Sequence, residues 1–138
     1  MARESWAYVK GVPVVEVAFE LADGSGTLVR RLQVDTGFYG PLASFVLSQA
    51  DCQAVEMLPG PFLHSLDAHG NAMLQPTAVV RATIPSLNLR TEGVAVCMAT
   101  VPGEHDGLVG LRFLDEHFAR WGSERDSSGN RRLWLERT

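Results

Sequence analysis

Alternation of apolar and polar residues marks the first part of the chain. Within residues 12–21, the odd positions from 15 onward carry apolar side chains, and the even positions between them carry glutamate or alanine. This period of two predicts a half-buried β-strand. A second alternating run, residues 27–34, follows an Asp-Gly dipeptide at 23–24 that favours a tight turn. The pattern predicts a hairpin whose second strand leads directly into Asp35.

Further apolar runs, separated by glycine, proline and polar residues, predict more strands. These strands are residues 62–66, 73–84 (with a bend at Pro76), 89–98, 118–121 and 132–136. Apolar residues at helical spacing predict one or two helical turns in residues 42–50. A second short helix is predicted to begin near Gly110 and to be completed by residues 115–118. Short strands at regular intervals with one or two short helices are typical of an all-β barrel or sandwich.

Length and composition narrow the class of protein. The 138 residues suffice for one domain with a real core and are too few for two ordinary domains. Apolar residues make up 46% and charged residues 20%, which indicates a globular chain. The net charge is −4 and the basic residues are scattered, whereas nucleic-acid binding needs a basic patch. No run approaches the ~20 apolar residues of a membrane span. We expect one domain, residues 1–138, with neither nucleic acid nor membrane as partner.

Cys52 and Cys97 lack the spacing of a metal site, and two cysteines do not make a disulfide framework. We therefore expect buried free thiols, in keeping with a reducing cytoplasm. The first residues contain no apolar core of the kind that a signal peptide needs. Both features favour a cytoplasmic protein.

Candidate chemistry begins with Asp35-Thr36-Gly37, at the mouth of the second strand. A carboxylate, a small hydroxyl and a glycine can place an acid in a tight turn, where backbone N–H groups and the hydroxyl hold it. A simpler interpretation is a turn in which the aspartate only caps the backbone. Three residues alone occur by chance in many proteins. The context favours a functional role, because a polar hairpin tip at His69-Gly70 and the run Leu108-Val109-Gly110 follow downstream.

In order and spacing, these motifs resemble those of a retropepsin-like aspartic protease of the single-domain bacterial type. The resemblance rests on residues 34–40, the hairpin tip and residues 108–110, and it covers the chain from residue 12 to its C-terminus. It implies an all-β, closed barrel-like fold with one or two short helices. It also implies that Asp35 is catalytic, that Thr36 and Gly37 form the active-site loop, and that residues 108–110 support this loop from behind. The short helix after that motif would be residues 111–118.

The resemblance further implies a flap over the substrate, formed by residues 62–75. The residues at its tip are Asp67, Ala68, His69, Gly70 and Asn71. The chain departs from viral members, which usually carry alanine where Phe38 follows Asp-Thr-Gly and have a more glycine-rich flap tip. The Phe-x-Gly continuation resembles the bacterial group instead.

Peptide hydrolysis by this route needs two carboxylates that share one proton, one as base toward a water and the other as acid toward the carbonyl oxygen. Two like charges about 3 Å apart cannot both ionise, so the apparent pKa values of the pair separate. The sequence contains one Asp-Thr-Gly and no Asp-Ser-Gly, so the second carboxylate must be Asp35 of another copy. The resemblance implies that Thr36 hydrogen-bonds across this homodimer, and that terminal strands such as residues 132–136 build the dimer sheet. We expect an endopeptidase that acts on peptides or proteins, with no metal and no cofactor.

Other interpretations stay open. The four histidines lack zinc spacing, and surface or loop positions suit them better. The chain could be a non-catalytic dimerisation or peptide-binding module that retains the protease-like fold. An intact Asp-Thr-Gly argues against that alternative, because a degenerate copy would be expected to have lost the aspartate. A third possibility is a small-ligand-binding β-barrel in which Asp35 belongs only to a turn.

Overall fold

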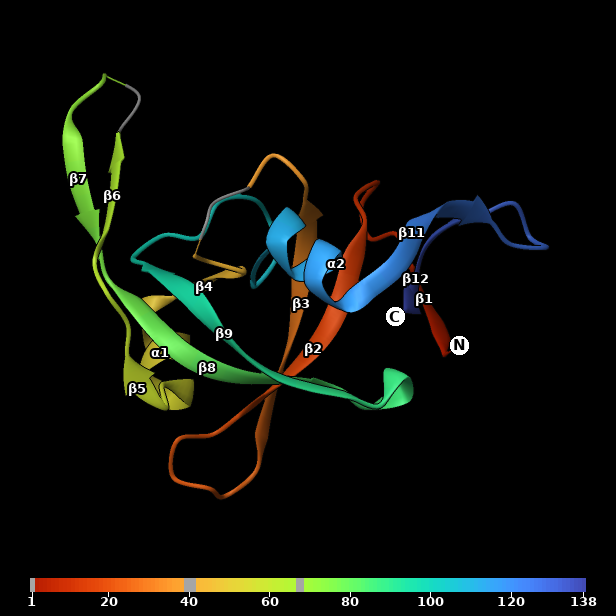
Figure 1. Cartoon of the computed structure of the whole chain (residues 1–138). Coiled ribbons are helices and arrows are strands. Elements are labelled where there is room, and N and C mark those ends of the chain that lie inside the picture. Colours follow the sequence, from red (N-terminus) through yellow and green to blue (C-terminus); the bar gives the residue numbers. More distant parts are fainter. Residues whose placement is uncertain (1, 39–41, 67–68) are drawn as a thin grey trace.

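The computed structural model describes residues 2–38, 42–66 and 69–138 (Figure 1). In this part of the chain strands predominate and close into a barrel, which confirms the predicted all-β barrel fold. In spatial order the barrel strands are β2 (Val14–Glu20), β3 (Thr27–Asp35), β10 (Gly107–Gly110), β4 (Phe45–Ser48), β9 (Leu89–Met98) and β8 (Thr77–Ile84). Pairing of β2 with β8 closes the ring, and the short β5 (Leu58–Pro59) also pairs with β8.

The predicted first hairpin, β2 with β3, is confirmed. Val17 and Phe19 of β2 are fully buried, as the alternation requires. In the turn between the strands, the backbone N–H of Ser25 donates to Asp23 Oδ1 over 2.9 Å. The hairpin therefore delivers Asp35 to the end of a strand that is held in the barrel on both sides.

Phenylalanine rings fill the barrel. The rings of Phe19 and Phe45 meet edge to face at 5.3 Å, and those of Phe45 and Phe113 lie 5.1 Å apart. Phe113 belongs to α2 (Leu111–His117), the helix predicted to begin near Gly110, which is its N-terminal cap residue. Burying each such side chain contributes about 1.5–3 kcal/mol, so α2 is fixed to the barrel by its apolar face.

Residues 42–50 differ from the prediction. They contain β4 and only the first residues of α1 (Gln49–Val55), which begins where Ser48 Oγ accepts the backbone N–H of Asp51 at 3.0 Å. β4 lies between β9 and β10 and buries Phe45, Val46 and Leu47 in succession. A strand buried on both faces shows no alternation, so its apolar run carries no signal of a strand, and the prediction of helical turns is wrong for residues 45–48.

The predicted long strand 73–84 is divided at Pro76 into β7 (Ala72–Gln75) and β8. β7 pairs with β6 (Leu63–Leu66), and this hairpin projects away from the barrel (Figure 1). Pro76 is anchored because its carbonyl accepts the N–H of Cys97 at 2.9 Å. At the far end of the hairpin, Asp67 and Ala68 lie outside the described residues.

The chain ends in a second sheet formed by β1 (Arg3–Ala7), β12 (Arg131–Arg137) and β11 (Phe118–Arg125). The predicted last hairpin is confirmed and is longer than expected, whereas β1 was not predicted. β12 lies in the middle and pairs on both sides within the chain. Within one chain neither edge of β12 is open, so a dimer sheet built by residues 132–136 would require one of these pairings to be exchanged for a strand of another copy, and the dimer sheet stays a prediction.

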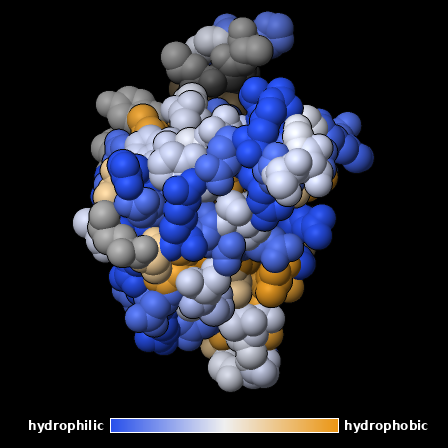
Figure 2. Space-filling model, turned by 90° about the vertical axis from the view of Figure 1, so that its right-hand side faces the viewer, coloured by the Kyte–Doolittle hydropathy of each residue, from blue (hydrophilic) through white to orange (hydrophobic). Residues whose placement is uncertain are grey.

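Charged side chains cover this terminal sheet. Arg3 bonds Glu124 at 2.8 Å across the sheet and lies 4.3 Å above the ring of Trp134. Figure 2 looks onto the side of the molecule that carries this sheet, and hydrophilic side chains cover most of that face. The barrel and this sheet are joined near the 3-10 turn η1 (Pro85–Leu87), where Arg137 donates to the carbonyl of Leu87 at 3.2 Å.

Cys52 of α1 and Cys97 of β9 form a disulfide, with their Cα atoms 6.0 Å apart. The prediction of free thiols is therefore wrong. Disulfides are typical of oxidising compartments, so the cysteines no longer argue for a reducing cytoplasm. The bond fixes α1 against β9, next to the anchor of Pro76.

Candidate active site

Asp35 is the last residue of β3 and is half-buried. Its Oδ1 accepts the backbone N–H of Gly37 at 3.0 Å, and its carbonyl accepts the N–H of Phe38 at 3.1 Å. Among the described residues, Oδ2 has no hydrogen-bond partner. Thr36 and Gly37 are exposed. The turn thus holds one carboxylate oxygen and leaves the other open for chemistry.

The run Leu108-Val109-Gly110 lies directly beside this turn. It forms β10, which runs parallel to β3 with Gly110 opposite Asp35. The N–H of the next residue, Leu111, donates to the carbonyl of Phe38 at 3.1 Å. A Cβ on Gly110 would lie 2.5 Å from that carbonyl oxygen, so only glycine permits the approach. The structure therefore places this run where the sequence prediction put it, against the Asp35 turn.

An ion pair and a backbone hydrogen bond fix β3 below the turn. Arg30 forms a two-pronged bond with Asp51 of α1, at 2.8 and 3.0 Å, and this hydrogen bonding raises the pKa of the Arg30 guanidinium. On the next residue, the backbone N–H of Arg31 donates to Asp106 Oδ2 at 2.9 Å. These contacts tie the strand that carries Asp35 to α1 and to the loop before β10.

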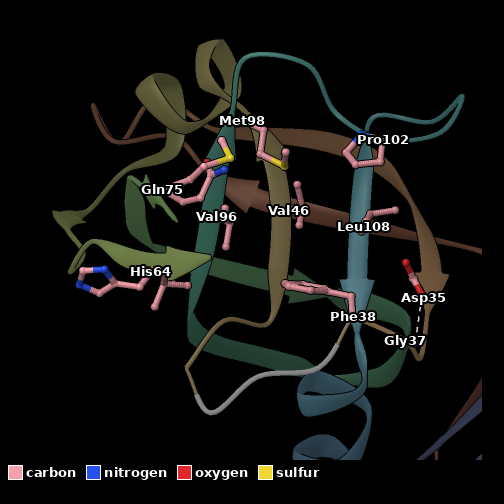
Figure 3. A pocket seen from close by; sticks show the side chains of 12 residues that line it. Asp35, Gly37, Phe38, Val46, His64, Gln75, Val96, Met98, Pro102 and Leu108 are labelled. Carbon is pink, nitrogen blue, oxygen red and sulfur yellow. Dashed lines mark hydrogen bonds between the residues drawn. The ribbon is translucent and has the colours of Figure 1, made fainter. Parts of the chain in front are cut away.

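A cavity of about 520 Å³ opens beside Asp35 (Figure 3), a size typical of ligand sites. It lies between the Asp35 turn, the strands β4, β9 and β10, and the β6–β7 hairpin. The described lining residues are Asp35, Gly37, Phe38, Val46, Leu63, His64, Met73, Gln75, Val96, Met98, Pro102 and Leu108.

Most of this lining is apolar. Val46, Val96 and Leu108 belong to a small apolar cluster separate from the main core, and Phe38 and Leu63 pack against it while only partly buried. Figure 3 shows Asp35 at one end of the cavity and Gln75 and His64 at the other. A ligand in this cavity would complete the burial of the cluster, which is the usual source of affinity in such sites.

The stem of the β6–β7 hairpin, and not its described tip, meets the cavity. Leu63, Met73 and Gln75 line it, whereas His69, Gly70 and Asn71 do not. The stem of the predicted flap therefore forms one wall of the cavity, through residues that the sequence analysis did not single out, and the closing of a flap over a substrate stays a prediction. Period-two alternation could have found them, because Leu63, Met73 and Gln75 share one face of the hairpin.

The geometry of the Asp35 turn is not unique in the chain. Asp23 accepts the N–H of Ser25 at 2.9 Å, and Asp126 accepts that of Ser128 at 2.9 Å, in the same i to i+2 pattern. These are ordinary turns at hairpin ends. Asp35 differs because β10 packs against its turn and because it lines the cavity.

In the described part of the chain, no group of three or more histidine, cysteine, aspartate or glutamate side chains is arranged to hold a metal ion. None of the helices described there is long and apolar enough to cross a membrane. Comparison with models of known protein families, with curated proteins and with solved structures finds no match to this chain.

Proposed function

We propose that the protein is a retropepsin-like aspartic endopeptidase that works as a homodimer. One observation carries the proposal: Asp35 of an Asp-Thr-Gly turn, one carboxylate oxygen of which has no hydrogen-bond partner among the described residues, stands at the end of a mostly apolar cavity that is lined by the stem of a hairpin. An acid beside a cavity of this size suits hydrolysis of a bound chain. The supporting contact of β10 against the turn fits a group whose position must be held closely.

A single carboxylate cannot supply the whole reaction. In the proposed dimer, the unprotonated Asp35 takes a proton from a water, and the water oxygen attacks the scissile carbonyl carbon. The protonated Asp35 of the other copy gives its proton to the carbonyl oxygen. Collapse of the tetrahedral intermediate then breaks the C–N bond: the first Asp35 gives the proton it took from the water to the leaving nitrogen, and a hydroxyl of the intermediate returns a proton to the second Asp35 as the product carboxyl forms. The pair shares one proton because two charges so close cannot both ionise.

The surroundings of the turn agree with a second copy there. Thr36 and Gly37 are exposed at the end of β3, although the turn borders an apolar cavity. A two-fold axis beside these residues would bring the two turns together and join the two cavities into one cleft. Each chain would then bind the part of the substrate on one side of the scissile bond, beneath its own hairpin.

The alternative function is a dimerisation or peptide-binding module without catalysis. One observation favours it: the Oδ1 contact of Asp35 is the same as that of Asp23, which closes a plain turn. In that case the cavity binds a peptide, and the carboxylate serves only the backbone.

The Asp35→Asn variant distinguishes the protease from the non-catalytic module. The asparagine oxygen can accept the Gly37 N–H as before, so the turn is kept while the acid is lost. Asp23→Asn is the matched control, since it makes the same change in the same kind of turn. Cleavage of a denatured protein substrate is followed from acidic to neutral pH, and the oligomeric state is followed by sedimentation.

We expect wild type and Asp23→Asn to cleave and Asp35→Asn to be inactive but still dimeric. An active Asp35→Asn would remove Asp35 from the mechanism. A wild-type protein that is monomeric and cleaves nothing would favour the binding module.

A further inference from the structure

The cavity wall farthest from Asp35 carries a carboxamide, that of Gln75. Gln75 lies on β7 opposite Leu63 of β6, so both side chains project from the cavity face of the hairpin. Figure 3 shows Gln75 beside Met98 and across the cavity from Asp35. It is half-buried, and within the described residues its side chain makes no hydrogen bond.

When a ligand fills the cavity, the Gln75 carboxamide needs a hydrogen-bond partner. A ligand that excludes water would leave its N–H and C=O groups unpaired, which is unfavourable. The ligand group that satisfies both at once has a donor and an acceptor side by side, as a second carboxamide does. A methyl or thioether end would satisfy neither.

The rest of the lining disfavours an acidic side chain in the ligand. No lysine or arginine is among the described lining residues, so an acidic side chain would find no counter-charge there. Val96 and Met98 offer an apolar wall beside Gln75, which suits the methylene stem of a long side chain. The ligand that combines an apolar stem with an uncharged donor and acceptor is a glutamine side chain.

We propose that the cavity is the subsite for a glutamine residue of the bound peptide, and that Gln75 determines this specificity. The inference rests on the proposed function, because it assumes that the cavity receives a peptide. The glutamine stem lies along Val96 and Met98, and the two carboxamides pair by reciprocal hydrogen bonds.

Binding tests this inference without requiring catalysis. In the Asp35→Asn background, fluorescence anisotropy measures the affinity of short labelled peptides. Each peptide carries glutamine, methionine or glutamate at one test position, and a series of peptides places this test position at each point of the sequence in turn. Methionine has about the same length as glutamine and lacks the carboxamide. At one position we expect glutamine to bind roughly tenfold better than methionine, and glutamate to bind worst.

Gln75→Leu should abolish the preference for glutamine over methionine, and Gln75→Met serves as a second variant if the first folds poorly. His64→Leu is the matched control, since His64 is the other polar residue of the hairpin stem at the cavity. That variant should keep the glutamine preference.

The inference is overturned if no position prefers glutamine, or if Gln75→Leu weakens all peptides equally, as a main-chain contact would. Cleavage by the wild type without a Gln75-dependent preference refutes the subsite alone. A Gln75-dependent preference in a protein that cleaves nothing refutes the proposed function and supports the subsite.

Discussion

Gly110→Ala tests whether β10 positions the Asp35 turn. Gly110 is buried opposite Asp35, and its φ of −101° is open to any residue, so the change is purely steric. The new Cβ would lie 2.5 Å from the Phe38 carbonyl oxygen and 2.7 Å from Phe38 Cδ2. A backbone oxygen cannot swing aside as the end of a side chain can. The turn itself must therefore move.

The cost follows from two terms. Overpacking at a buried site costs about 1–3 kcal/mol. Displacing the Phe38 carbonyl also weakens its hydrogen bond from Leu111, now 3.1 Å, which is worth about 1 kcal/mol. Together they predict a loss of about 2–4 kcal/mol in the free energy of unfolding. Since Phe38 follows Asp35 closely, a shift of this turn should also lower activity by up to about 100-fold.

Urea unfolding and peptide cleavage measure the two effects. Gly122→Ala is the control, because its new Cβ would meet only the Trp134 side chain, at 3.1 Å, in the terminal sheet. That variant should lose less than about 1 kcal/mol and keep its activity. A Gly110→Ala protein as stable and as active as Gly122→Ala would refute the role given to β10.

Two further predictions concern stability. Burial lowers the pKa of His117, and the positive charge of Arg137 lowers it further, whereas the negative charge of Glu116 acts in the opposite direction. Because the net shift is downward, His117 binds a proton more readily in the unfolded chain than in the folded one. Stability should fall as pH drops below about 6.5, and His117→Phe should flatten this dependence in urea titrations at several pH values; an unchanged pH profile would contradict the assignment. Reduction of Cys52–Cys97, which are 45 positions apart, should lower the free energy of unfolding by roughly 2–4 kcal/mol. The reductant should have no effect on Cys97→Ala, and equal unfolding midpoints of the oxidised and reduced wild type would argue against the bond.

The sequence predicted those parts of the fold that have one exposed face. β2 and β3 alternate because one side meets the core, and the Asp-Gly turn between them is a local signal. The position of Asp35 followed from this hairpin. The close approach of Gly110 to the Asp35 turn was predicted only from the resemblance, because β3 and β10 are distant in the sequence and meet through a parallel pairing.

The errors arise where distant contacts decide the structure. β4 pairs with β9 and β10 along its two edges, and its faces are buried because Phe45 and Leu47 lie in the main core and Val46 in the smaller apolar cluster, so its residues carry no period of two. β1 is short and half-exposed and is held by its pairing to β12 at the other end of the chain. The approach of Cys52 to Cys97 likewise depends on tertiary structure, which spacing does not reveal.

The central claim is that two copies of Asp35 make one catalyst, and subunit mixing tests it most directly. Wild-type and Asp35→Asn chains are refolded together at varied ratios and constant total concentration, and peptide cleavage is measured. If each active site needs both carboxylates, activity follows the square of the wild-type fraction, and an equal mixture retains about a quarter of the full rate. Activity in direct proportion to the wild-type fraction would show that one chain suffices and would contradict the account.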